Sequence, residues 1–291
     1  MKNKFKDMTA EECAKYYIKG ALKIILFYVI SLFIVSAIYE KGCSYILPLT
    51  DGGIEIQEIY ECAYRVWITF FAIAVVLCVI ITLIRLGVHF GNYFGIHTSL
   101  CDPEKYIEAE KILCKKIHFK QKDKYTKCRM ANAYMSLEDY DNAWEMYKDV
   151  IPKDISKCNT RLILEGLSCY YFSIGDMENG KKYLARIEEL QSGKKNSKFW
   201  GLAINNIKGS LAIDEKKYDE AKEYINKCME YRVLSNCAKV CCLFKLATIA
   251  YETDDYIEAI CLYKNVIDMG GKHHYVAKAK EKLEELKKRI I

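Results

Sequence analysis

The sequence lacks the motifs that mark the common classes of enzyme. It contains no Walker phosphate-binding loop, no dinucleotide fingerprint, no nucleophile elbow and no HExxH metal motif. It also lacks a strong excess of one charge, because the formal net charge is +6 and the basic and acidic residues are interspersed. We therefore expect no catalysis by this chain alone, no cofactor and no nucleic-acid partner.

Metal-binding spacings are also missing, although cysteine is abundant. Cys237, Cys241 and Cys242, with Cys228 upstream, do not form the paired short knuckles of structural zinc sites. The His273-His274 pair follows two glycines and predicts a solvated turn. Ten of the 14 cysteines lie from residue 101 onward, in the part that we expect to be cytoplasmic and reduced. We predict buried thiols there and no metal site.

Two long apolar runs are present near the N-terminus. Residues 24–39 are uncharged for 16 positions and residues 66–84 for 19, close to the roughly 20 residues that cross a bilayer. A cleaved signal peptide is an alternative for the first run, but its apolar core exceeds the roughly 7 to 15 residues that are usual there. We interpret the two runs as an uncleaved helical hairpin, with transmembrane helices at 21–39 and 66–86.

The basic residues near the predicted helix ends set the orientation. Six lysines against three acidic residues precede the first helix, and two basic against five acidic residues separate the helices. The excess of Lys and Arg predicts that both termini are cytoplasmic. The abundance of Lys, Ile and Tyr with little Pro favours a bacterial cell membrane, with a eukaryotic organelle membrane as the alternative. The predicted domains are a cytoplasmic N-terminal segment (1–20), the first helix (21–39), an outer loop (40–65), the second helix (66–86), a juxtamembrane segment (87–102) and a repeat domain (103–291).

Several residues in and beside the hairpin are candidates for contacts. Cys43 and Cys62 fall near the two ends of the outer loop, where a disulfide is a candidate. On a continued helix, glycines four residues apart form a smooth stripe that admits a neighbouring helix, whereas the alternative is a flexible hinge. These helix-packing candidates are Gly87, Gly91 and Gly95. The aromatic residues between them, from His89 to Phe94, predict an interfacial belt.

A small residue recurs beneath large apolar ones in the rest of the chain, each time just after an acidic turn. The spacings between successive small residues are 34, 37, 41 and 38, close to the period of a stacked helix pair. The small residues are Ala109, Ala143, Gly180, Ala221 and Ala259. The pattern predicts an all-α solenoid.

The four units that follow residue 124 resemble the tetratricopeptide repeat family. The first carries the small and aromatic residues of that repeat at Ala131, Tyr134, Tyr140, Ala143, Tyr147 and Pro152. The usual early tryptophan is absent from all four units, and only the first has the closing proline. The resemblance implies about four helix pairs, and the charged segment 275–290 predicts a C-terminal capping helix.

The resemblance also implies a concave groove lined by the first helix of each pair. The groove candidates are Tyr125, Asn132, Glu165, Phe172, Asn206, Phe244 and Tyr251. No basic residue stands at the groove positions, so we expect a partner segment with apolar side chains rather than a terminal carboxylate. We predict a membrane-anchored adaptor that holds a protein partner at the cytoplasmic membrane face. The alternative is a structural or sensory subunit of a multi-subunit membrane complex assembled through the hairpin.

Overall fold

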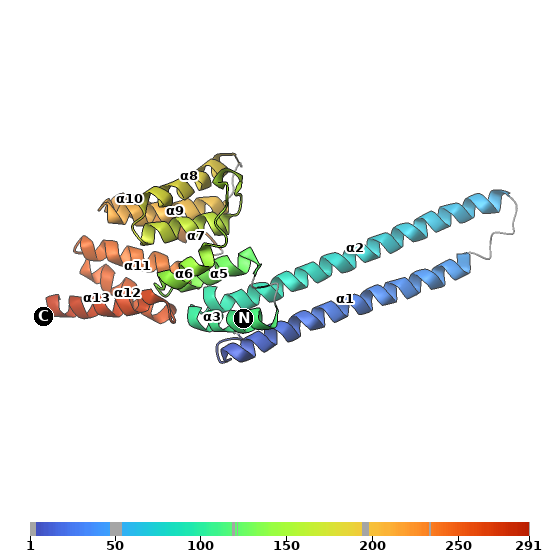
Figure 1. Ribbon diagram of the computed structural model, residues 1–291, viewed down its shortest axis with the longest axis horizontal. Helices are drawn as coiled ribbons and strands as arrows, with labels where there is room; N and C mark the ends of the chain where they lie inside the picture. Colours follow the sequence, from blue (N-terminus) through green and yellow to red (C-terminus); the bar gives the residue numbers. More distant parts are fainter. Residues whose placement is uncertain are drawn as a thin grey trace. The chain divides into compact units, whose positions relative to one another are not determined.

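The computed structural model describes residues 4–46, 54–117, 120, 122–193, 198–232 and 234–290. Within these residues the chain forms twelve α-helices and no strand, so the predicted all-α class is confirmed (Figure 1). The chain divides into two compact units. One is Glu12–Tyr93, and the other combines Met1–Glu11 with Phe94–Ile291.

The first unit is a pair of long antiparallel helices, α1 (Ala10–Ile46) and most of α2 (Ile54–Thr98). By length and composition both helices can cross a membrane. Large apolar side chains point away from the pair, and Phe33 and Phe70 are 75% and 65% exposed. The helices extend beyond the predicted spans because the flanking residues contain no proline, and α1 ends two residues before Pro48.

Glycines allow the two long helices to approach each other. A Cβ on Gly20 would lie 2.2 Å from the His89 ring, and a Cβ on Gly42 would lie 2.2 Å from Trp67. The His89 Nε2 donates to the Tyr17 carbonyl oxygen at 2.9 Å. His89 is therefore buried between the helices, where the sequence predicted part of an interfacial belt.

The second unit is an array of helix pairs. After α3 (Pro103–Lys116) come α5 (Lys124–Met135) with α6 (Tyr140–Tyr147), α7 (Arg161–Ser173) with α8 (Met177–Gly193), α9 (Lys198–Asp214) with α10 (Tyr218–Met229), and α11 (Asn236–Glu252) with α12 (Tyr256–Met269). A short 3-10 helix, η2 (Ile155–Lys157), lies between the first two pairs, and α13 (His274–Ile290) ends the array. The four predicted pairs and the capping helix are confirmed.

Local sequence explains how each pair forms. Aspartate side chains cap the helices by accepting backbone N–H groups, as Asp102 does from Lys105 at 3.1 Å and Asp123 from Thr126 at 2.7 Å. The turn inside each pair contains one residue with positive φ. These four residues are Glu138, Gly175, Lys216 and Asp254. The same turn is therefore repeated in every pair.

The recurring small residues provide the close contact between the two helices of a pair. Ala143, Ala221 and Ala259 have no exposed surface. A Cβ on Gly180 would lie 2.6 Å from the Phe172 ring, so that ring packs directly on the glycine backbone. The predicted packing of large side chains over small ones is what joins the helices of each pair.

Candidate binding cavity of the repeat array

The last helix pair and the capping helix contact the beginning of the array. The Lys272 N–H donates to the Cys101 carbonyl oxygen at 2.8 Å, and the His274 N–H donates to that of Ser136 at 3.0 Å. The side-chain amide of Asn236 donates to the Ser99 carbonyl oxygen at 2.8 Å. These hydrogen bonds join the two ends of the array around the cavities that the first helices of the pairs line. The sequence predicted a concave groove but not this contact between its ends.

Ion pairs reinforce this closure. Lys278 on α13 donates to the Glu138 carboxylate in the turn after α5. Lys272 contacts Glu104 of α3 at 2.7 Å. His273 is buried, so the predicted solvated turn is wrong: its ring lies 3.6 Å from the Cys241 thiol.

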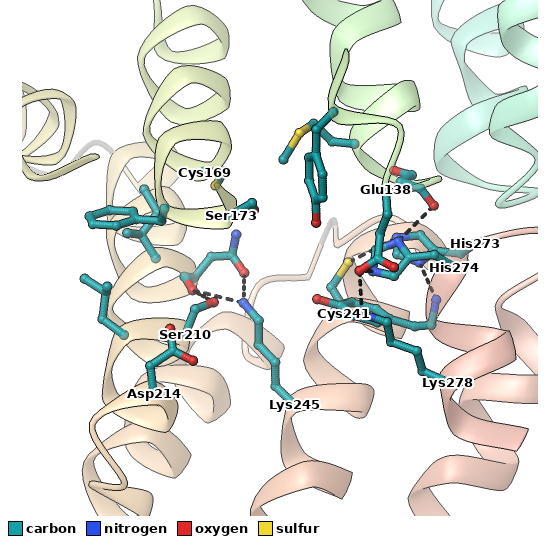
Figure 2. Close-up of a pocket in the computed structure, with 18 residues that line it drawn as sticks. Glu138, Cys169, Ser173, Ser210, Asp214, Cys241, Lys245, His273, His274 and Lys278 are labelled. Carbon is teal, nitrogen blue, oxygen red and sulfur yellow. Dashed lines mark hydrogen bonds and ion pairs between the residues drawn. The ribbon is translucent and has the colours of Figure 1, made fainter. Parts of the chain in front are cut away.

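One cavity has a volume of about 320 Å³. Its wall combines the C-terminal ends of α5, α7 and α9 with residues of α11 and of the start of α13. Figure 2 shows two groups of side chains in its wall. One group comes from α7, α9 and α11, and the other gathers Glu138 and Cys241 with the residues at the start of α13. The labelled wall residues are Glu138, Cys169, Ser173, Ser210, Asp214, Cys241, Lys245, His273, His274 and Lys278.

A second cavity, of about 410 Å³, has a more apolar wall. It contains Leu162, Leu202 and Leu234 together with an ion pair, Arg161 to Glu165 at 2.5 Å. The two cavities share wall residues. These are Met135, Ser136, Cys169, Asn206 and Cys241.

A lysine lies in the wall of the first cavity. Lys245 Nζ donates to the Asn206 side-chain oxygen at 2.7 Å and to its backbone carbonyl at 3.1 Å. Burial raises the pKa of the Glu165 carboxyl, while the charges of Arg161 and Lys245 act to lower it. Desolvation likewise raises the pKa of Asp214, while the charge of Lys245 acts to lower it. The interior therefore combines charges of both signs with apolar surface.

Four of the predicted groove residues line the cavities. Asn132 and Glu165 belong to the second cavity, Phe172 to the first, and Asn206 to both. Asn132 and Asn206 also serve the fold, because Asn132 accepts a hydrogen bond from Tyr147 and Asn206 holds Lys245.

The other three groove candidates do not line either cavity. The Phe244 ring stacks on Tyr275 with centroids 4.1 Å apart. Tyr251 is buried, and its hydroxyl donates to Glu285 at 3.1 Å. Both are covered because α13 packs on the fourth pair. Tyr125 is 54% exposed at the first turn of α5.

The sequence did not indicate that Lys245, His273 and His274 line the first cavity. Lys245 follows the predicted Phe244, so a register one residue further along α11 would have found it. The approach of His273 to Cys241 joins positions 32 residues apart, and no local pattern signals that contact.

The candidates in the hairpin have separate surroundings. The helix α2 continues through Gly87, Gly91 and Gly95, and a Cβ on Gly87 or Gly91 would meet nothing within 4 Å. Cys62 is exposed, whereas the Cys43 side chain lies outside the described residues. The disulfide and the packing role of these glycines remain predictions.

The cysteines of the interior form a thiol cluster. Cys237 is hydrogen-bonded to Cys101, and its pKa is raised to about 12 by that bond and by burial. Burial raises the pKa of Cys169 to about 12. Among the described residues no three such side chains are placed to hold a metal ion. Thiols with raised pKa values remain protonated at neutral pH, as small buried groups.

A model of the tetratricopeptide repeat family matches residues 125–151 and 202–232. The first range contains all but the first residue of α5 and all of α6, and the second contains most of α9 and all of α10. No curated protein matches the sequence. The matched ranges are the first and third of four pairs that share the same turn and the same small buried residue. Two of the four helix pairs of this chain therefore match the tetratricopeptide repeat family.

Proposed function

We propose that this protein is a membrane-anchored adaptor whose repeat array holds a protein partner at the cytoplasmic membrane face. The observation that carries the proposal is the presence, in one chain, of an apolar helical hairpin and of a tetratricopeptide array. Repeats of this family generally act as protein-interaction scaffolds without enzymatic activity. A hairpin that anchors such an array raises the concentration of its partner at the membrane.

The size and lining of the interior favour a short segment of the partner. The cavities of about 320 and 410 Å³ fall in the range of roughly 300 to 1,000 Å³ that is usual for ligand sites. Such volumes accept a few side chains, whereas a long helix needs an open groove. We infer that the partner inserts a chain end or a loop tip.

Photocrosslinking in the membranes of the host tests the partner site. A benzophenone side chain is placed at Ser173 or Leu162, which line the two cavities, and at the control position Ile257, which is 85% exposed on α12. We expect one protein to crosslink from the cavity positions and not from Ile257. Crosslinks that arise equally from Ile257, or from Ile257 alone, would remove the interior as the partner site.

The adaptor role makes a second demand, namely that the partner reaches the membrane through this chain. The membrane-bound share of the crosslinked partner should fall in cells without the protein. Wild type and Ile257→Trp should restore that share, while Ser173→Trp, which fills the cavity, should not. A partner that stays at the membrane in the absence of this chain contradicts the adaptor role.

A second candidate function is that of a subunit in a membrane complex assembled through the hairpin. The open space beside Gly87 and Gly91 favours this candidate, because a Cβ at Gly91 would meet no atom of the described residues within 4 Å. Loss of a complex in Gly91→Leu would therefore be due to another chain. Gly20→Leu is the contrasting variant, since its side chain would collide with His89 and separate the two helices.

A further inference from the structure

The net positive charge of this protein is concentrated in one short segment. The chain has 44 basic and 38 acidic residues, and residues 111–127 contain seven lysines and a single aspartate. The remaining residues are balanced, with 37 basic and 37 acidic side chains. The sequence first indicated that the charges are interspersed. The excess of +6 instead lies in the segment that runs from the end of α3 to the start of α5.

Most of these lysines have no acidic partner within the described part of the chain. Lys120 pairs with Glu110 at 2.8 Å, and Lys127 pairs with Asp149. The aspartate of the segment, Asp123, accepts the backbone N–H of Thr126 and caps α5. The lysines that remain exposed and outside the ion pairs are Lys111, Lys115, Lys116, Lys122 and Lys124.

An exposed aromatic residue lies within the same segment. Tyr125 follows Lys124 directly, is 54% exposed and lines neither cavity of the array. Tyrosine is enriched where one end of a side chain is apolar and the other is wet, as at the headgroup level of a bilayer. A basic surface that also presents tyrosine matches a membrane interface better than bulk water.

We propose that these five lysines and Tyr125 bind the headgroups of anionic phospholipids in the membrane that holds the hairpin. The inference rests on the proposed anchoring and extends it. The cytoplasmic leaflet is negatively charged and attracts polybasic segments near transmembrane helices. Because the hairpin tethers the segment to the same bilayer, binding is intramolecular and weak contacts suffice.

The composition of the segment favours lipid over nucleic acid. All seven basic residues are lysines, and no arginine occurs between residues 111 and 127. Arginine provides the bidentate and stacking contacts that nucleic-acid recognition uses, whereas lysine acts as a hydrated point charge. A diffuse array of point charges fits a surface of mobile headgroups. The segment thus forms a second membrane contact of the chain.

Lysine acylation of the full-length protein in lipid nanodiscs tests the proposal. One set of discs contains phosphatidylcholine only, and the other contains roughly one-third phosphatidylserine. We expect acylation of Lys115 and Lys122 to slow by about fivefold or more in the anionic discs, since one lysine at such a surface contributes about that factor. Lys264 and Lys280, exposed on α12 and α13, should be unchanged. Added salt should restore the faster rate.

A pair of charge-matched variants supplies the second measurement, which is amide exchange of residues 111–117 and 122–127 in the same discs. In the test variant glutamine replaces Lys115, Lys116, Lys122 and Lys124. In the control variant glutamine replaces Lys181, Lys182, Lys264 and Lys280, which are also exposed. The control variant should keep the protection by phosphatidylserine, and the test variant should lose it.

The outcomes separate this inference from the anchoring on which it rests. A chain that does not enter the discs contradicts the anchoring itself. A chain that enters them but shows equal acylation in both lipids overturns the lipid site alone. Protection of the same lysines by a short RNA in phosphatidylcholine discs, without protection by phosphatidylserine, assigns the segment to nucleic acid and also overturns the proposal.

Discussion

Gly271 lies where the two ends of the array meet, and its contribution to this closure can be tested separately. Gly271 has φ +53, and a Cβ at this position would lie 2.6 Å from the Leu100 carbonyl oxygen and 2.7 Å from that of Cys101. Gly175 has a similar φ of +81, but a Cβ there would meet nothing within 4 Å. Gly271→Ala therefore combines backbone strain with a collision across the closure, whereas Gly175→Ala has the strain alone.

The two alanine variants should differ by a measurable free energy of unfolding. Left-handed backbone costs an L-residue about 1 kcal/mol, and non-glycine residues occupy the turn equivalent to Gly175 in the other pairs. The collision at Gly271 also displaces the Lys272 hydrogen bond to Cys101, worth about 1 kcal/mol, and its neighbouring contacts. We expect Gly175→Ala to cost about 1 kcal/mol and Gly271→Ala about 3 kcal/mol.

Thermal unfolding and amide exchange measure this difference. For a domain of this size each kcal/mol lowers the Tm by about 2 to 4 °C, so Gly271→Ala should lower it by roughly 6 to 12 °C. The amides of Lys272 and His274 should exchange faster in Gly271→Ala only, because they donate across the closure. Equal Tm shifts in the two variants, with unchanged exchange, would refute the claim that closure stabilises the array.

Three further predictions concern the buried charges, the thiols and the topology. Replacing Glu110 with Gln leaves the charge of Lys120 buried and should cost about 3 to 5 kcal/mol in urea unfolding. Glu284→Gln, in an exposed pair, should cost far less, and equal costs would contradict the buried pair. At pH 8 the exposed Cys261 should be alkylated much faster than Cys237, which is buried and whose pKa is raised to about 12. Comparable rates by mass spectrometry would mean that the interior is open. Protease added outside intact cells should cut a tag in the outer loop and spare tags at both termini, whereas cleavage at either terminus reverses the predicted orientation.

Local patterns explain why the repeats could be predicted. Two kinds of residue act within a single helix pair: the aspartates that precede helices, and the small buried residues Ala143, Ala221 and Ala259. Because their contacts are local, the spacing of these residues along the sequence is enough to locate each pair. The same holds for the capping helix, whose alternation of apolar and charged residues is local. Because every pair uses the same turn and the same packing of large side chains on a small residue, the repeat can be recognised in a single sequence.

Closure could not be predicted because it joins distant residues without a local signal. Asn236 and Ser99 are 137 positions apart, and His274 and Ser136 are 138 apart. A backbone carbonyl accepts a hydrogen bond whatever its own side chain is, so these contacts leave no trace in residue types. The superhelical curvature of the array decides them, and small rotations between repeats accumulate into that curvature.

The contacts of the glycines in the hairpin could not be predicted from the sequence either. A spacing of four residues identified Gly87, Gly91 and Gly95 as one face, but the spacing does not say which face meets the partner helix. The face that meets α1 is set by the register of the hairpin, and it brings Gly20 and Gly42 against large rings. Among the described residues, a Cβ on Gly87 or Gly91 would meet nothing within 4 Å. Loss of a complex in Gly91→Leu, in a hairpin that keeps its contact between Gly20 and His89, would therefore be due to a second chain, which makes this variant a test of assembly through the membrane.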